Sequence, residues 1–134
     1  MNERTNRFQN VLLCEDIRDE VGGKHSLMGV FSADITVPSF PAFIQLAAYV
    51  QYRLNPGFEG EINGTISIFQ DDTKFVEGAV KGLAKTPETF VTFILPKAIV
   101  TFDRPCTYRI VIEIDGHQEE VLSKKILLSD LGAS

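Results

Sequence analysis

Segments that alternate apolar and polar residues recur along this sequence, with turn-forming residues between them. The clearest runs from Tyr108 to Asp115, where Tyr or Ile occupies every second position up to Ile114. No window of a dozen residues holds a helical period free of Gly or Pro. A period of two residues places successive side chains on opposite faces of a β-strand. The chain is therefore predicted to be all-β.

Eight or nine strands are predicted from this pattern. Their ranges are 8–16, 26–32 with a continuation over 33–37, 43–54, 61–70, 75–84, 89–95, 98–102, 108–115 and 119–128. Turn residues about every eight to twelve positions favour two packed sheets. We expect an antiparallel two-sheet sandwich with an immunoglobulin-like topology as first choice. A jelly roll or a closed barrel has the same local pattern and stays an alternative.

The turns carry specific signals. Gly22-Gly23 tolerates positive φ and is expected to join 8–16 to 26–32 as a hairpin, while Asp115-Gly116 between alternating segments is the strongest hairpin signal in the chain. The prolines of 38–41 indicate a loop or one helical turn, and Pro96 is expected to end the strand before it. Two glycines dilute 75–84, which is predicted to be an edge strand.

Length and charge narrow the functional classes. The 134 residues suit a single domain spanning 1–134, with 1–7 and 129–134 expected to fray. A net charge of −5 argues against nucleic acid and anionic membrane surfaces as partners. We expect no signal peptide, because Met1 to Arg7 is polar and no apolar run follows it, and no run of apolar residues is long enough to span a membrane. Cys14 and Cys106 lie in apolar segments, so we expect buried, reduced thiols and a cytoplasmic location.

The charged segment Glu15–Lys24, followed by Ser26-Leu27-Met28-Gly29-Val30-Phe31, resembles a bacterial family of uncharacterised proteins. Phe40-Pro41-Ala42 and the segment from Tyr108 to Glu113 with Asp115-Gly116 are also similar to that family. The resemblance covers most of the chain. It informs the fold and implies no activity, cofactor or catalytic residue.

Two clusters are candidates for metal binding. The run Glu15–Lys24 could bind a cation or a basic partner, but it lacks the alternating Asp, Asn and Gly pattern of a calcium loop, so a solvated hairpin is favoured. Cys14 and His25 could face each other across the first hairpin, and Cys106 and His117 have the same spacing. Zinc sites usually include a tight ligand pair such as Cys-x-x-Cys, which is missing here, so a coincidence is favoured.

The sequence contains no motif of a known catalytic or nucleotide-binding site. We therefore predict no catalytic, cofactor-binding or metal-binding residue. Aromatic side chains in a Pro-rich loop, a turn and the outer face of a long strand form a candidate contact surface, with covering one end of the core as the alternative. These residues are Phe40, Phe43, Tyr49 and Phe58.

Two classes of function remain. The favoured one is a non-enzymatic protein-binding or assembly module, whose partner could be a second copy held against the outer face of strand 43–54 or a neighbouring edge. The alternative is a small enzyme or ligand-binding protein with a site among the end loops, where carboxylates near Asp16 and Asp19 are the first candidates.

Overall fold

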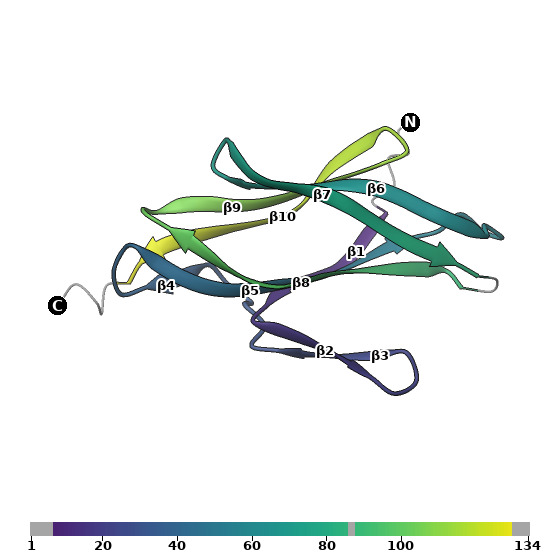
Figure 1. Ribbon diagram of the computed structural model, residues 1–134, viewed down its shortest axis with the longest axis horizontal. Coiled ribbons are helices and arrows are strands. Elements are labelled where there is room, and N and C mark those ends of the chain that lie inside the picture. The colour runs from purple at the N-terminus through teal and green to yellow at the C-terminus, as the bar shows by residue number, and fades with distance from the viewer. Residues whose placement is uncertain (1–6, 86–87, 130–134) are drawn as a thin grey trace.

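The computed structural model describes residues 7–85 and 88–129, and every regular element in these ranges is a β-strand (Figure 1). The strands are β1 (Phe8–Cys14), β2 (Asp16–Glu20), β3 (Lys24–Met28), β4 (Ile35–Val37), β5 (Ala42–Arg53), β6 (Gly60–Gln70), β7 (Thr73–Ala84), β8 (Phe90–Phe102), β9 (Cys106–Ile114) and β10 (His117–Leu128). The all-β prediction is confirmed. No helix in the described residues is long and apolar enough to cross a membrane.

The strands form two layers and a separate hairpin. One layer is a three-stranded sheet in the order β1-β5-β8, and the other is a five-stranded sheet in the order β4-β10-β9-β6-β7. The hairpin β2-β3 extends below the three-stranded sheet in Figure 1. The predicted two-sheet sandwich is confirmed, and neither sheet closes on itself. One pairing departs from the antiparallel prediction, because β4 reaches β10 by a long connection and pairs with it in parallel.

The core lies between the inner faces of the two sheets. Alternate residues of β5 point inward, including Leu46, Ala48 and Val50, and they belong to the same buried cluster as Ile110 and Ile112 of β9. The largest fully buried side chains are Phe102, Leu13, Ile110, Ile112, Ile126 and Val50. This is the burial that a period of two residues predicts for strands with one covered face.

The first predicted strand is wrong in one respect. Segment 8–16 divides at Glu15: β1 pairs with β5, and a new strand, β2, pairs with β3 through the Gly22-Gly23 turn. The reason is chemical, because Leu13 and Cys14 are buried whereas the charged residues that follow are mostly exposed. A carboxylate cannot enter the core unpaired, so the chain leaves the sheet where the charges begin.

Pro96 does not end a strand as predicted, because β8 runs continuously from Phe90 to Phe102. The pairing of β5 with β8 shifts register between Leu46 and Ala48, opposite Ala98 and Leu95, so Pro96 sits at an irregularity. β8 is also an edge strand, where a missing N–H breaks no ladder bond.

The predicted strand 26–32 ends earlier than expected, at Met28, and its predicted continuation 33–37 is a separate strand, β4, in the five-stranded sheet. Several other local predictions agree with the structure. β5 and β6 match the predicted ranges closely, and β7 is the edge of its sheet. Asp115 and Gly116 have φ values of 55° and 78°, as a primed hairpin turn requires. Of the segments expected to fray, 1–6 and 130–134 lie outside the described residues. The backbone carbonyl of Arg7 accepts a hydrogen bond from Arg53, and the Ser129 amide donates to Val37.

Candidate interaction surface

The two lateral sides of the sandwich are built differently. On the side where β1 ends its sheet, the segment 29–34 lies against the edge, and the Phe31 amide donates to the Leu13 carbonyl over 2.8 Å. The same segment reaches the opposite sheet, where the Lys125 amide donates to Asp34 Oδ1. On the other side β7 and β8 are the end strands of their sheets. We call this the open side of the sandwich (Figure 1).

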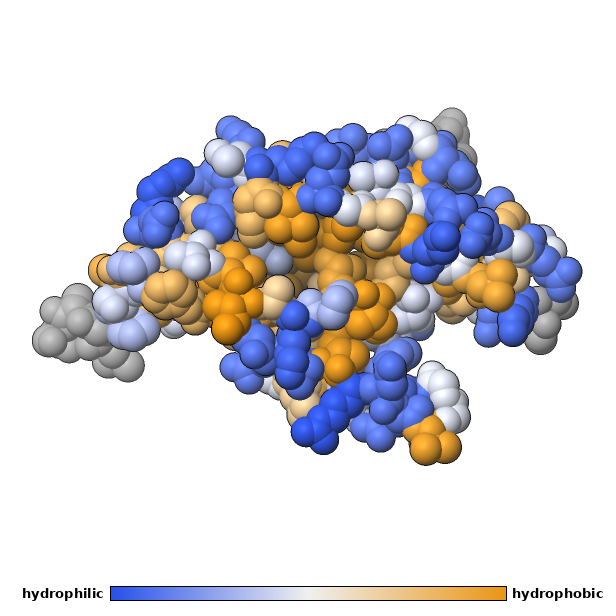
Figure 2. Space-filling model, in the orientation of Figure 1, coloured by the Kyte–Doolittle hydropathy of each residue, from blue (hydrophilic) through white to orange (hydrophobic). Residues whose placement is uncertain are grey.

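An apolar groove runs between β7 and β8 on the open side. It has a volume of about 260 Å³, and Figure 2 shows its apolar lining at the centre of the face. Its walls include Val76 and Val80 from β7, Leu95 and Val100 from β8, and Ile66 and Ile68 from β6. A contiguous apolar hollow with a polar rim is typical of a surface that contacts another molecule.

The glycines of β7 shape this groove. Gly82 sits so close to Val91 that any side chain at this position would collide with it, so glycine lets β7 and β8 meet at that end. Four residues earlier Gly78 has no atom within 4 Å of where a Cβ would stand. The groove is therefore closed at one end and open along the residues from Phe75 to Val80.

Within residues 7–85 and 88–129, β7 presents a long free edge beside the groove. It has 12 residues, and its first nine, from Thr73 to Lys81, are exposed apart from Val80. A register shift in its pairing with β6 leaves Phe75 out of the ladder, and the Phe75 ring lies 6.3 Å from that of Tyr108. Beyond the shift, Val76, Gly78 and Val80 are on the inner face of the sheet opposite Ile68, Ile66 and Gly64. An uncovered edge of this kind displays unpaired N–H and C=O groups.

Charged residues mark the outer face of β7. Lys74 Nζ lies 3.4 Å from Glu77 Oε2, and Lys81 Nζ lies 3.8 Å from Glu61 Oε2 on β6. The Glu77 and Lys81 side chains are 56% and 67% exposed, so both stay accessible to a partner. Exposed pairs of this kind contribute little to stability, which leaves these charges free to act in recognition.

The edge of β8 differs from that of β7. Pro96 removes a backbone donor near its middle, and Lys97 beside it pairs with Asp16 of the hairpin at 3.5 Å. Ile99 is 69% exposed on the outer face. Because proline cannot supply the backbone donor that an added strand needs, the β7 edge is the more accessible of the two.

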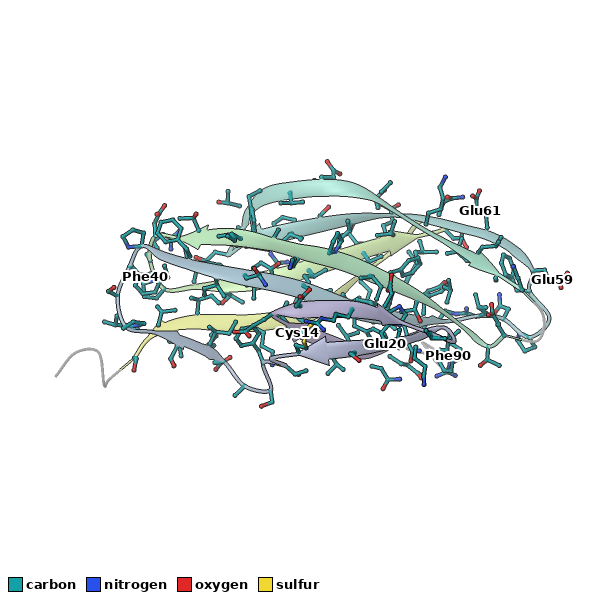
Figure 3. All side chains as sticks on the ribbon, turned by 60° about the horizontal axis from the view of Figure 1, so that its bottom comes forward. Cys14, Glu20, Phe40, Glu59, Glu61 and Phe90 are labelled. Carbon is teal, nitrogen blue, oxygen red and sulfur yellow. The ribbon has the colours of Figure 1, made fainter. Side chains whose placement is uncertain are left out.

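The four aromatic residues predicted to form a contact surface do not lie together. Phe40 and Phe58 are partly buried against the core, and Figure 3 places Phe40 at one end of the molecule and Glu59, the neighbour of Phe58, at the other. Phe43 is 69% exposed on the outer face of β5. Tyr49 is on the same face, with its ring 5.8 Å from the ring of His25 in the hairpin.

The charged segment Glu15–Lys24 forms most of the β2-β3 hairpin and is held by contacts within the chain. Gln45 donates from Nε2 to the Glu15 carbonyl over 2.9 Å, and Ser26 donates to Glu20 over 2.7 Å. His25 Nε2 lies 3.3 Å from Asp19. No three His, Cys, Asp or Glu side chains in the described ranges converge as metal ligands do. Asp16 is paired with Lys97 of β8, and Asp19 with His25 of the same hairpin.

The two thiols are buried in different sheets. Cys14 pairs with Ala47 rather than facing His25, because the hairpin begins only at Asp16. Burial raises the pKa of both the Cys14 and the Cys106 thiol above its ordinary value. A raised pKa keeps the thiol protonated and poorly nucleophilic, which disfavours a catalytic role.

Reasoning from the sequence missed the groove residues Val76 and Val80 and the charges Glu77 and Lys81. Their signal was present as the alternation of valine with glycine over 76–82, with the opposite charges of Glu77 and Lys81 between them. This pattern was interpreted as a weak strand, because the second wall of the groove is formed by apolar residues of β8, which is in the other sheet.

The comparisons with known proteins give the family of this chain and assign no activity to it. Residues 9–126 match the model of a family of unknown function, DUF6941. The chain belongs to this family. The matched segment runs from the second residue of β1 into β10, so the family model covers both sheets, the hairpin and the open side. No curated protein matches the chain.

Proposed function

We propose that this DUF6941 member is a non-enzymatic protein-binding or assembly module, and that it binds through the open side of its sandwich. The observation that carries the proposal is the free edge of β7 beside an apolar groove. An added strand would pair its backbone with this edge and place alternate side chains in the groove. Backbone pairing would supply affinity, and the groove would select apolar side chains.

The surroundings of the groove support protein as the partner. With a net charge of −5 the molecule does not favour nucleic acid or anionic lipid. The free thiols of Cys14 and Cys106 suit a reducing compartment, and we propose a cytoplasmic location. No cofactor or metal enters this proposal.

Selection from a phage-displayed library of random peptides tests the proposal on the purified protein. We expect enrichment of peptides that alternate apolar and polar residues, with binding measured by fluorescence polarisation. Val76→Glu, in the groove, should weaken binding by more than about tenfold, because it buries an unpaired charge. Leu128→Glu is the matched control, since Leu128 is comparably exposed at 47% against 42% for Val76 and lies on β10.

Thermal unfolding of both variants would show that the substitutions leave the fold intact. Failure of the monomeric protein to enrich any peptide would contradict the proposal. Equal peptide binding by the two variants would place the binding surface elsewhere and would contradict it as well.

A further inference from the structure

The β7 edge is complementary to itself. When two identical strands pair antiparallel about a twofold axis, one residue faces its own copy across the axis, and we say that this residue lies on the axis. A residue a given number of positions before it then faces the residue the same number of positions after it in the other copy. With Ala79 on the axis, Glu77 of each copy faces Lys81 of the other. Both side chains are on the exposed outer face of the sheet, so the two contacts form on the same face.

Other registers lose this complementarity. An axis at Glu77 or at Lys81 sets identical charges against each other, which is destabilising. An axis at Gly78 or at Val80 sets Glu77 or Lys81 against Ala79 and forms no charge pair between these positions. Among the positions from Glu77 to Lys81, only Ala79 on the axis joins opposite charges.

The inner face fits the same register. Val76 of one copy faces Gly82 of the other, and Gly78 faces Val80. On each side of the axis, two valines therefore face two glycines, so that each valine side chain lies next to a residue without one. The pairing also covers the mouth of the groove, whose walls include Val76 and Val80.

We infer that two copies of this chain associate by antiparallel pairing of β7 with β7, with Ala79 on the twofold axis. The two five-stranded sheets then become one continuous sheet, and each copy fills the open side of the other. This inference rests on the proposed function and names the partner of that surface as a second copy.

Disulfide scanning tests the register directly. At Ala79 the two Cα atoms would be about 4.5–5.5 Å apart, within the roughly 4.4–6.8 Å that a disulfide spans. Ala79→Cys should therefore cross-link into a dimer under mild oxidation. Glu77→Cys alone should not, because its two copies are about 13 Å apart along the strand. An equimolar mixture of Glu77→Cys and Lys81→Cys should cross-link.

The unsubstituted chain, whose own thiols are buried, is the control for this series. Ala79→Cys that stays monomeric on a non-reducing gel would overturn the inference. So would Glu77→Cys that cross-links to itself as readily as Ala79→Cys.

Charge exchange tests the contacts by sedimentation velocity. Glu77→Lys and Lys81→Glu should each raise the dimer dissociation constant about tenfold, because like charges then face each other twice per dimer. Each substitution also removes an ion pair within the chain. An equimolar mixture of the two variants restores opposite charges across the axis without restoring those internal pairs. The mixture should dimerise more tightly than either variant, and a mixture as weak as its components would overturn the inference.

The outcomes separate this inference from the proposed function. A chain that stays monomeric while its peptide binding is lost in Val76→Glu would overturn the self-pairing and leave the binding module standing. A dimer that Ala79→Cys does not cross-link would overturn this interface. A monomer that also enriches no peptide would overturn both.

Discussion

Gly64 is predicted to be intolerant of any side chain, although it lies in the middle of a regular strand. A Cβ at this position would stand 2.5 Å from the Glu113 carbonyl oxygen and 2.8 Å from Cγ1 of Ile114. Ordinary carbon contacts begin near 3.5 Å, so the added methyl is about 1 Å too close. The oxygen belongs to the backbone of β9, which pairs with β6 in the interior of the five-stranded sheet, so it cannot rotate away.

The size of the effect follows from two opposing terms. Overpacking of this kind costs about 1–3 kcal/mol. Replacing glycine by alanine restricts the unfolded chain and offsets about 0.4–1 kcal/mol of that. Gly64→Ala should therefore lower the free energy of unfolding by about 1–2 kcal/mol, equivalent to a fall in Tm of roughly 3–8 °C.

Urea titration at low protein concentration, where self-association does not contribute, measures this change. Gly78→Ala is the matched control, because Gly78 is on the adjacent strand and has no atom within 4 Å of its Cβ position. We expect Gly78→Ala to stabilise the fold by about 0.4–1 kcal/mol. Gly64→Ala as stable as the unsubstituted chain would show that β6 and β9 separate easily, and the steric reasoning would be wrong.

Three further predictions concern the turn, the thiols and a buried phenol. Gly116→Val should destabilise by at least about 1 kcal/mol in urea titration, because Gly116 has a φ of 78°; unchanged stability would refute the strain. Cys14 and Cys106 should react slowly with a thiol reagent in the native state and fully in denaturant, and rapid native labelling would contradict their burial. Burial raises the pKa of Tyr108 to about 12, against about 10 in the unfolded chain. The stability that the buried, protonated phenol contributes is therefore intact below about pH 10 and is lost as the pH rises through about 12. Tyr108→Phe should reduce this alkaline loss of stability, followed by circular dichroism, and an unchanged dependence on pH would contradict the prediction.

The sequence predicted the strands well wherever the face on which a side chain lies depends only on the strand's own residues. Alternation over 43–54 and 108–115 gave the buried faces of β5 and β9, because side chains in a strand alternate whatever its neighbours are. The alternation gave wrong faces where the pairing between two strands shifts in register. Ala47 lies opposite a shift in register and Phe75 lies within one, and Ala47 is buried although the period places it outside. A bulge depends on the partner strand, which the local pattern does not specify.

The candidate surface was less predictable than the strands that form it. The weak signal of 75–84 correctly indicated an edge, since glycine dilutes a strand that has only one neighbour. The partner across the groove, β8, is in the other sheet, and the intervening residues give no sign of that proximity. Strand order is set by pairings between residues far apart in sequence, and these are invisible to a window of a dozen residues.

The edges of this sandwich show why the charges on β7 matter. The edge of β1 is covered by the segment 29–34, and that of β8 is interrupted by Pro96. In the part of the chain that the structure describes, β7 has neither protection and carries the charges of Lys74, Glu77 and Lys81 instead. Charges on an edge suppress indiscriminate pairing, because most incoming strands would leave them unpaired or opposed to like charges. With opposite charges four residues apart, however, a second copy in one register satisfies both, so the same residues that exclude other strands would select this one.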